Sequence, residues 1–244
     1  MIDIHCHILP DFDDGADSLT EALDMAQMAA LSGVTDIIAT PHFRGVLEEL
    51  EQLPTIRQQY ELLSTAIYQA QIPLRLHPGA EILCVPETVS LAISHQLPTL
   101  AQTNYVLTEF YFDESYSFMD ETLGEIAASG YKPVVAHPER YGVIQREPQL
   151  LRRWARQGYV IQLNKGSVLG AFGSRPEQAA NEILAMGLAH LFASDAHSCH
   201  SRTPHMGALR QWVDELCDMD YAAILLEENP HRLLHGHPMV GMDD

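Results

Sequence analysis

The stretch MIDIHCHILPDFDDG (residues 1–15) opens the chain, and its HxH pair decides how the rest is interpreted. A β-strand alternates faces with a period of two residues, so odd-numbered residues 3–7 would share one face and even-numbered residues 4–8 the other. The imidazoles of His5 and His7 would then converge. An isolated HxH pair also occurs on ordinary strands, so the remaining strands must show whether this pair binds something.

Strand-like and helical runs alternate along the whole sequence. The first helix is predicted over 17–33, where Ser18 and Glu21 form a capping box and Gly33 ends the helix. After the strand at 1–8, we predict strands at 35–42, 74–82, 105–110, 132–140, 159–168 and 188–197. Further helices are predicted at 46–71, 117–130, 147–157, 175–187 and 204–219, while 83–104 is irregular or only briefly helical. This alternation implies right-handed βαβ units and a parallel sheet.

Nearly every predicted strand ends in a residue type that binds metal ions. In chain order these residues are His5, His7, His42, Glu81, Glu109, His137, Asp195 and His197. The carboxyl ends of all strands meet on one face of a parallel barrel, whereas an open sheet would spread them along an edge. We therefore predict an α/β fold, specifically a distorted TIM-like (β/α)7 barrel, as a single domain over 1–244.

These polar residues would be costly to bury without compensating charge, and few cationic partners are available. Counting Asp14 of the DFDDG run, four carboxylates (Asp14, Glu81, Glu109 and Asp195) bring −4. Three divalent ions would leave the pocket at about +2, so an acidic protein would gain an anion-binding centre. Imidazole and carboxylate ligands suit Mn²⁺, Fe²⁺ or Zn²⁺.

The composition excludes some classes of partner. Of 244 residues, 14 are Lys or Arg and 33 are Asp or Glu, and a formal charge of −19 disfavours nonspecific binding to nucleic acid or an anionic membrane. The four cysteines are scattered without a CxxC pair, which argues against a disulfide framework. No basic leader and no run of 18 apolar residues appears, so we expect a cytoplasmic protein without membrane insertion. The oligomeric state is not predicted.

The motifs resemble those of the PHP (polymerase and histidinol phosphatase) superfamily. They are DIHCHILPDFDDG, TPHF, GAEI, LTEF, AHPERY, SDAHS and RTPHM, in order from residue 1 to about 206, and the tail EENPHRLL fits the terminal helix of the family. The set is most similar to the bacterial metal-dependent protein-tyrosine phosphatases of capsule and exopolysaccharide synthesis. The resemblance implies a distorted seven-stranded barrel around three metal ions, most simply Mn²⁺, with Fe or Zn as alternatives.

The resemblance also implies a role for each site residue. His5, His7, Glu81 and Asp195 would hold one ion, Glu81, Glu109 and His137 a second, and Asp14, His42 and His197 the third. Asp11 or Asp13 could replace Asp14. Arg140 and Arg202 would grip the phosphate oxygens while a metal-activated hydroxide attacks phosphorus in line. His42 or a metal-bound water would donate the proton to the leaving group. The implied substrate is a phosphotyrosine protein, the tail of a bacterial tyrosine kinase.

Other mechanisms and functions compete with this interpretation. A cysteine-dependent phosphatase needs a CxxxxxR loop, but the sixth residue after each cysteine is Phe12, Ser90, His205 or Ala223. An amidohydrolase needs a lysine on the fourth strand, where this chain has Glu109. Histidinol phosphatase, or another small-molecule phosphatase of the PHP group, is the main alternative. A regulatory barrel that is stabilised by metal and has no turnover is the non-enzymatic one.

Overall fold

The structure is a computed structural model that describes residues 1–217 and 219–241. Its strands are β1 (Ile2–Cys6), β2 (Asp36–Ala39), β3 (His42–Arg44), β4 (Arg75–Pro78), β5 (Glu81–Leu83), β6 (Tyr105–Glu109), β7 (Lys132–Val135), β8 (Val160–Asn164) and β9 (Leu191–Ala193). They form two sheets, ordered β1-β2-β4 and β3-β5-β6-β7-β8-β9, and every ladder is parallel. The expected parallel α/β organisation is confirmed.

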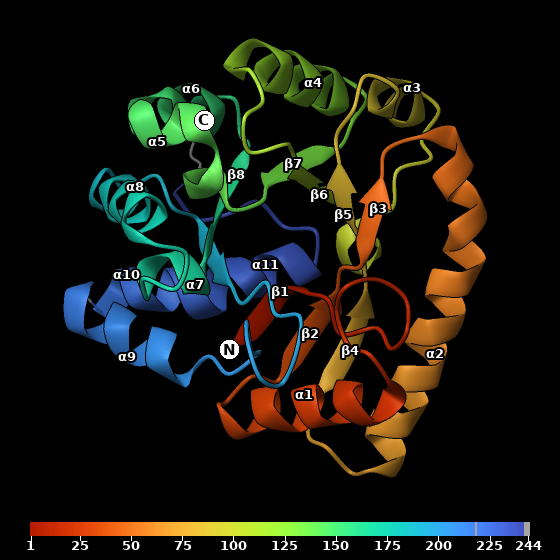
Figure 1. Ribbon diagram of the computed structural model, residues 1–244. Helices are drawn as coiled ribbons and strands as arrows, with labels where there is room; N and C mark the ends of the chain where they lie inside the picture. The colour runs from red at the N-terminus through yellow and green to blue at the C-terminus, as the bar shows by residue number, and fades with distance from the viewer. Residues whose placement is uncertain (218, 242–244) are drawn as a thin grey trace.

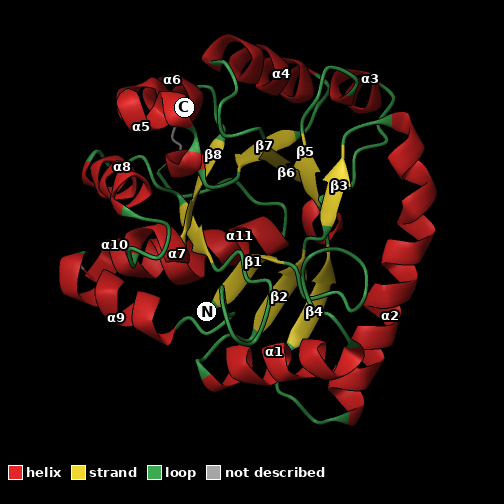
Figure 2. Ribbon diagram, in the orientation of Figure 1, coloured by secondary structure: helices red, strands yellow, loops and turns green. Residues whose placement is uncertain are grey.

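Helices surround the strands on the outside (Figures 1 and 2). The α-helices are α1 (Leu19–Leu31), α2 (Leu53–Gln69), α3 (Thr88–Ile93), α4 (Tyr116–Ala128), α5 (Gly142–Arg146), α6 (Leu151–Arg156), α7 (Lys165–Val168), α8 (Ser174–Ala185), α9 (Gly207–Leu216), α10 (Met219–Ala223) and α11 (Asn229–Leu234). Short 3-10 turns are η1 (Leu47–Gln52), η2 (Leu100–Gln102), η3 (Pro138–Arg140) and η4 (Pro148–Leu150), and η5 (Ile224–Glu228) is a π-helix. Within the described part of the chain, no helix is both long and apolar enough to cross a bilayer.

Two predicted strands are each broken in the middle. The run 35–42 divides into β2 and β3 around Pro41, which has no N–H to donate to a ladder. The run 74–82 divides into β4 and β5 at the same level, around Gly79. A side chain at Gly79 would lie 2.7 Å from Ile38, so this close approach requires glycine. The two breaks leave His42 and Glu81 opposite each other in register.

The strict alternation predicted for residues 3–8 is wrong in part. The register of β1 against β2 shifts between Asp3 and Cys6, where β1 has one residue more than its partner. Such a bulge turns later side chains relative to earlier ones. As a result Ile4 and Cys6 belong to different apolar clusters, although they would share a face in a regular strand. The imidazoles of His5 and His7 still converge, with their Nε2 atoms 3.2 Å apart.

Other predicted elements differ mainly at their ends. The predicted strand 132–140 stops at Val135, because Pro138 begins the turn η3, and the strand 159–168 gives way at Lys165 to the short helix α7. The strand 188–197 is reduced to β9. Helix α5 lies outside the predicted ranges, α7 lies inside a predicted strand, and α10 begins at the last residue of the predicted helix 204–219, because such short helices carry little periodic signal. The predicted helix 204–219 includes residue 218, which lies outside the described residues.

Two apolar clusters hold the elements together. The larger lies between helices and strands and includes Met25, Leu63, Leu123 and Trp154. The smaller takes side chains from six strands, including Ile4, Ile38, Leu107, Val134, Val160 and Leu191, together with Leu233 of α11. Between β1 and β9 the pairing is one isolated bridge, from Cys6 to Ala196, beside two backbone hydrogen bonds of 2.8 Å. Because no continuous ladder joins these strands among the described residues, the predicted closed barrel is not shown.

Candidate metal centre

The carboxylate of Glu81 lies at the centre of four imidazoles. Its Oε1 is 3.2 Å from His5 Nε2 and 3.0 Å from His137 Nε2. Its Oε2 is 3.3 Å from His7 Nε2 and 3.1 Å from His42 Nδ1. Glu81 is buried and begins β5, whose neighbour β3 begins at His42. The structure therefore brings together residues that are up to 132 positions apart in the chain.

A second group lies at the solvent side of this cluster. Asp14 Oδ1 is 3.3 Å from His42 Nε2 and 3.4 Å from His197 Nε2, and one ligand atom of His7 completes a set of four within 4.8 Å of one another. Asp14 is exposed, on the loop after β1. Gly15 packs so closely on the carbonyl of His7 that any side chain there would clash, and this contact closes the loop over the cluster.

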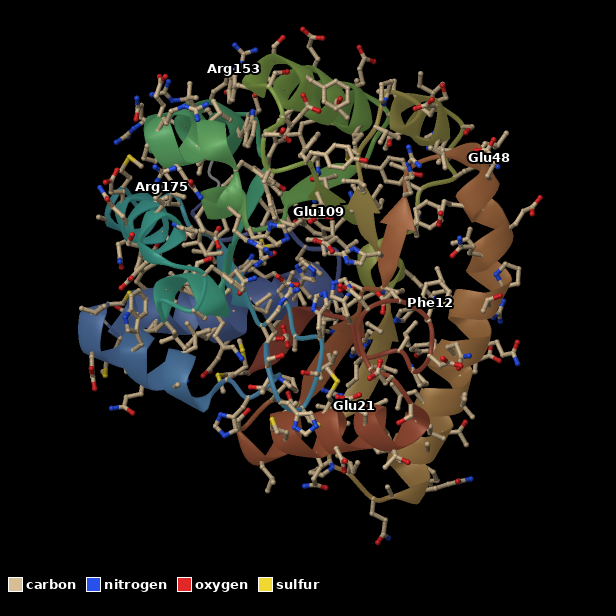
Figure 3. All side chains as sticks on the ribbon, viewed as in Figure 1. Phe12, Glu21, Glu48, Glu109, Arg153 and Arg175 are labelled. Carbon is tan, nitrogen blue, oxygen red and sulfur yellow. The ribbon has the colours of Figure 1, made fainter. Side chains whose placement is uncertain are left out.

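Glu109 and Asp195 complete the predicted set. Glu109, at the end of β6, lies 3.8 Å from His137 and 4.0 Å from His42, and Figure 3 labels it among the side chains crowded in the middle of the molecule. Asp195 Oδ1 lies 3.5 Å from His5 Nε2 and follows β9. Together with the two groups around Glu81 and Asp14, all nine predicted ligands lie in one contiguous cluster.

Both predicted arginines contact Asp195. Arg140 Nη1 donates to Oδ2 at 3.2 Å, and Arg202 Nη2 donates to Oδ1 at 2.6 Å. The Arg140 guanidinium also lies between the rings of Phe112 and Phe172, 4.4 and 4.6 Å from their centroids. The arginines are thus placed beside the cluster rather than on a distant surface acid.

Sequence reasoning missed how the histidines are oriented, since Gln162 was not considered and Asp13 was considered only as a replacement for Asp14. Gln162 Oε1 lies 3.1 Å from His5 Nδ1, and Asp13 Oδ2 lies 2.8 Å from His7 Nδ1, so each ring turns its Nε2 toward Glu81. Outer partners of this kind fix the tautomer and direction of a ligating histidine. Asp13 also accepts the backbone N–H of His42 at 2.9 Å. A polar glutamine inside the buried strand run VIQLN was the signal available for Gln162.

A second missed group supports Asp195. Asn164 Nδ2 donates to Asp195 Oδ2 at 2.5 Å, and the buried Glu139 accepts both the backbone N–H of Asn164 and the hydroxyl of Ser167. Burial raises the pKa of Glu139 to about 7. The HPERY motif therefore supplies more than one arginine, because its glutamate anchors the segment that holds Asp195.

Backbone conformation at the cluster is strained. His137, Asp195 and Arg202 have φ values of 34°, 50° and 50°, in the left-handed region that residues other than glycine rarely adopt. Such strain is tolerated where surrounding structure enforces it, commonly at functional sites. Three predicted site residues therefore have backbone conformations that strand or helix geometry would not predict.

The electrostatics of the cluster are unbalanced without cations. Burial, followed by the nearby charge of Glu81, raises the pKa of Glu109 to about 7. Burial, followed by the charge of His7, lowers the pKa of His197 to about 4. Among the described residues, His137 Nδ1, Gln162 Nε2 and Arg202 Nε are buried without a hydrogen-bond partner. Crowded carboxylates and imidazoles are the ligand set that divalent cations bind.

Imidazoles and carboxylates gathered at the carboxyl ends of parallel strands define the class of an α/β metallohydrolase. The chain belongs to the capsular polysaccharide synthesis CpsB/CapC family, whose model matches residues 1–235. This finding confirms the resemblance stated from the motifs.

Known relatives are similar to this chain over most of its length. The tyrosine-protein phosphatase YwqE of Bacillus subtilis (strain 168) is 36% identical over 205 residues, covering 84% of this chain and 80% of YwqE. One solved structure belongs to a set that covers YwqE of Bacillus subtilis and CpsB of Streptococcus pneumoniae, described as metal-dependent tyrosine phosphatases. It superposes on this chain with a TM-score of 0.86 at 34% identity, and the match covers 98% of this chain and 96% of that one. A proposed histidinol phosphatase of Listeria monocytogenes, hisK, shares the fold alone, with a TM-score of 0.53 at 11% identity over 89% of this chain and all of that one.

Proposed function

We propose that this protein is a metal-dependent protein-tyrosine phosphatase of capsule or exopolysaccharide synthesis. The observation that carries the proposal is the convergence of four imidazoles on Glu81 with two arginines on the adjacent Asp195. Cations held there would bind a phosphoryl group, and the arginines would bind its oxygens. The activity named for YwqE, at 36% identity, supports a phosphotyrosine protein as substrate. We further propose that this substrate is the tail of a bacterial tyrosine kinase.

We propose that the cluster holds three divalent ions. One would be held by His5, His7, Glu81 and Asp195, a second by Glu81, Glu109 and His137, and the third by Asp14, His42 and His197. The donor set fits such ions, because seven of its nine residues, all but His137 and Asp195, fall in overlapping groups whose ligand atoms lie within 4.8 Å of one another, and its carboxylates lack enough cationic partners. The imidazole-rich set favours Mn²⁺, Fe²⁺ or Zn²⁺ over Mg²⁺. Mn²⁺ is our first choice.

Each side chain has a distinct task in the proposed hydrolysis. The bound ions would supply an activated water and positive charge at the phosphoryl oxygens. Arg202 presents a buried Nε–H that has no partner in the part of the chain that the structure describes, and this group can donate to a phosphate oxygen. Arg140 is held by two rings, which fixes the direction of its remaining donors. His42, whose side chain is 42% exposed, is the candidate proton donor to the leaving oxygen, with a water of the centre as the alternative.

We also propose that the chain is one domain over 1–244 in which β1 to β9 close as a distorted seven-stranded barrel, each broken strand counting once. The apolar cluster shared by six strands supports closure, as does the bridge from Cys6 to Ala196. A cytoplasmic location is supported by the thiols of Cys6, Cys84 and Cys199, which are in no disulfide.

The test is turnover by protein reconstituted with Mn²⁺. We expect a phosphotyrosine peptide to be hydrolysed with a kcat/KM well above that for histidinol phosphate. The opposite order would favour a small-molecule phosphatase, the alternative that shares the fold of hisK. No turnover of either substrate by fully loaded protein would instead favour a regulatory barrel.

A further inference from the structure

A cavity of 400 Å³ lies directly beside the metal centre. His42 and Glu109 line it on the side of the cluster, and Phe12, Arg44, Leu83 and Glu49 line it elsewhere. It is therefore continuous with the place where the phosphoryl group would bind. Any group attached to that phosphate on this side must enter this cavity.

The strand register sets the length of the cavity. His42 and Arg44 are two residues apart on β3, so their side chains project on the same side of the strand. Arg44 pairs with Leu83 of β5, and Leu83 pairs with Glu109 of β6. Two residues advance a strand by roughly 6.6 Å. This step, from the level of His42 to that of Arg44, is comparable with the length of a phosphorylated phenol ring.

The walls suit a neutral aromatic group. Phe12, on the loop after β1, packs partly against the core and lines the cavity, and Leu83 adds an aliphatic contact. Arg44 is exposed and lines the same cavity, so its guanidinium can meet the face of a ring. Glu49 faces the same space and disfavours a second anionic group there.

We propose that this cavity is the leaving-group subsite, in which the tyrosyl ring of the substrate packs against Phe12 and beneath Arg44. The inference rests on the proposed phosphatase function and deepens it, because the subsite would select aryl over alkyl phosphates. Phe12 and Arg44 are specificity-determining residues in this proposal, and neither is a metal ligand or part of the phosphate grip.

Another pair of rings lies near the centre, but it is already occupied. Phe112 and Phe172 each lie against the guanidinium of Arg140, at 4.4 and 4.6 Å, so each ring presents one face to Arg140 instead of to a substrate. Phe112 therefore provides a matched comparison, since it is an aromatic residue beside the same cluster whose loss should not affect aryl selectivity.

The test compares two phosphonates that differ only in the group on phosphorus. Phenylphosphonate and methylphosphonate are titrated calorimetrically into Mn²⁺-loaded protein. The native protein should bind phenylphosphonate more tightly, and Phe12→Ala should reduce that preference about tenfold while leaving the Kd of methylphosphonate unchanged. Arg44→Gln should reduce the preference about threefold. Phe112→Ala, and Arg57→Gln as a charge control on α2, should leave the preference unchanged.

Two further measurements keep the result interpretable. Because Phe12 precedes Asp13, which orients His7, the metal content of each variant is measured, and Phe12→Leu serves as a variant that keeps apolar volume. An unchanged preference in Phe12→Ala, or a loss confined to Phe112→Ala, would overturn the subsite. If phosphotyrosine peptides are hydrolysed while that preference is unchanged, the subsite fails and the proposed function stands. A reduced preference without peptide turnover would leave the subsite standing and remove the protein substrate.

Discussion

Two clusters each join a buried acid to histidine, one around Asp36 at the start of β2 and the other around Glu81 at the start of β5. At the start of β2, Asp36 accepts two hydrogen bonds from Arg75, at 2.8 and 2.9 Å, one from Thr35 at 2.8 Å, and lies 2.8 Å from His77 Nε2. Its pKa falls to about 2, because these hydrogen bonds, led by that from Arg75, outweigh the effect of burial. Asp36 therefore has hydrogen-bonding and cationic partners within the protein and needs no added ion.

The cluster around Glu81 also combines acids with histidines, but its charges and polar atoms are not all balanced within the protein. Four imidazoles meet one carboxylate there, and His137 Nδ1 is buried with no hydrogen-bond partner among the described residues. The difference shows that acids and histidines alone do not mark a metal site. What marks a metal site is a local excess of metal-ligating atoms over positive charge, which an added cation can balance.

The largest expected effect is removal of metal. Thorough chelation should abolish phosphatase activity, and Mn²⁺ should restore it at least as well as Mg²⁺, because imidazole ligands select against magnesium. Turnover of a phosphotyrosine peptide is measured before chelation, after it and after each metal is added back. Full activity in demetallated protein would remove the distinction between the two clusters.

Replacing the central acid of each cluster sharpens the comparison. Glu81→Ala should lower kcat/KM at least about a hundredfold and reduce bound metal, since one carboxylate would serve two ions. Asp36→Ala, the matched control, should change both by less than about twofold. Metal content is measured by elemental analysis beside the kinetics, and unchanged stoichiometry in Glu81→Ala would contradict the bridging assignment.

The arginines of the two clusters should also behave differently. Arg140→Ala and Arg202→Ala should each lower kcat/KM by about 10- to 100-fold while sparing metal, because a guanidinium binds phosphate oxygens but cannot ligate a cation. Arg75→Ala should leave kcat/KM unchanged. Near-native kinetics in both site variants would eliminate the phosphate clamp, whereas lost metal would reassign these arginines to support of the cluster.

The cluster around Asp36 should matter for stability instead. Asp36→Ala should lower the free energy of unfolding by about 1–2 kcal/mol, a modest loss because Arg75 is largely exposed and regains water. Urea unfolding of the metal-loaded protein measures it. If the free energy of unfolding fell by a similar amount in metal-free Glu81→Ala and did not fall in Asp36→Ala, the roles that we assign to the two acids would be reversed.

The smallest effect is a pH dependence at the amino ends of the strands. Burial lowers the pKa of His190 to about 4, and its Nδ1 accepts the backbone N–H of Ile161. The neutral ring is thus favoured in the folded state, so its contribution is present above pH 6.5 and is lost as the pH falls toward 4. Urea midpoints between pH 7 and pH 4.5 should fall less steeply in His190→Gln than in the native chain. Equal slopes would show that His190 does not contribute.

The sequence by itself determined the alternation of strands and helices and the nine candidate ligands. Apolar period and capping signals are local, so the helix from Ser18 and the strand at Tyr105 can be derived from short windows. The ligands stand out because polar residues follow apolar strands. The family of the chain was also evident from these motifs, and the family match confirms it.

Only the tertiary structure decided which groups face which. The bulge in β1, the paired breaks at Pro41 and Gly79, and the turn that begins at Pro138 depend on neighbouring strands. The contacts of Gln162 with His5, of Asp13 with the backbone of His42 and of Arg140 with Asp195 join residues that are distant in sequence. Hydrophobic period specifies which face of a strand is buried, whereas the register between parallel strands sets the distances across that face, and register is a property of the assembled sheet.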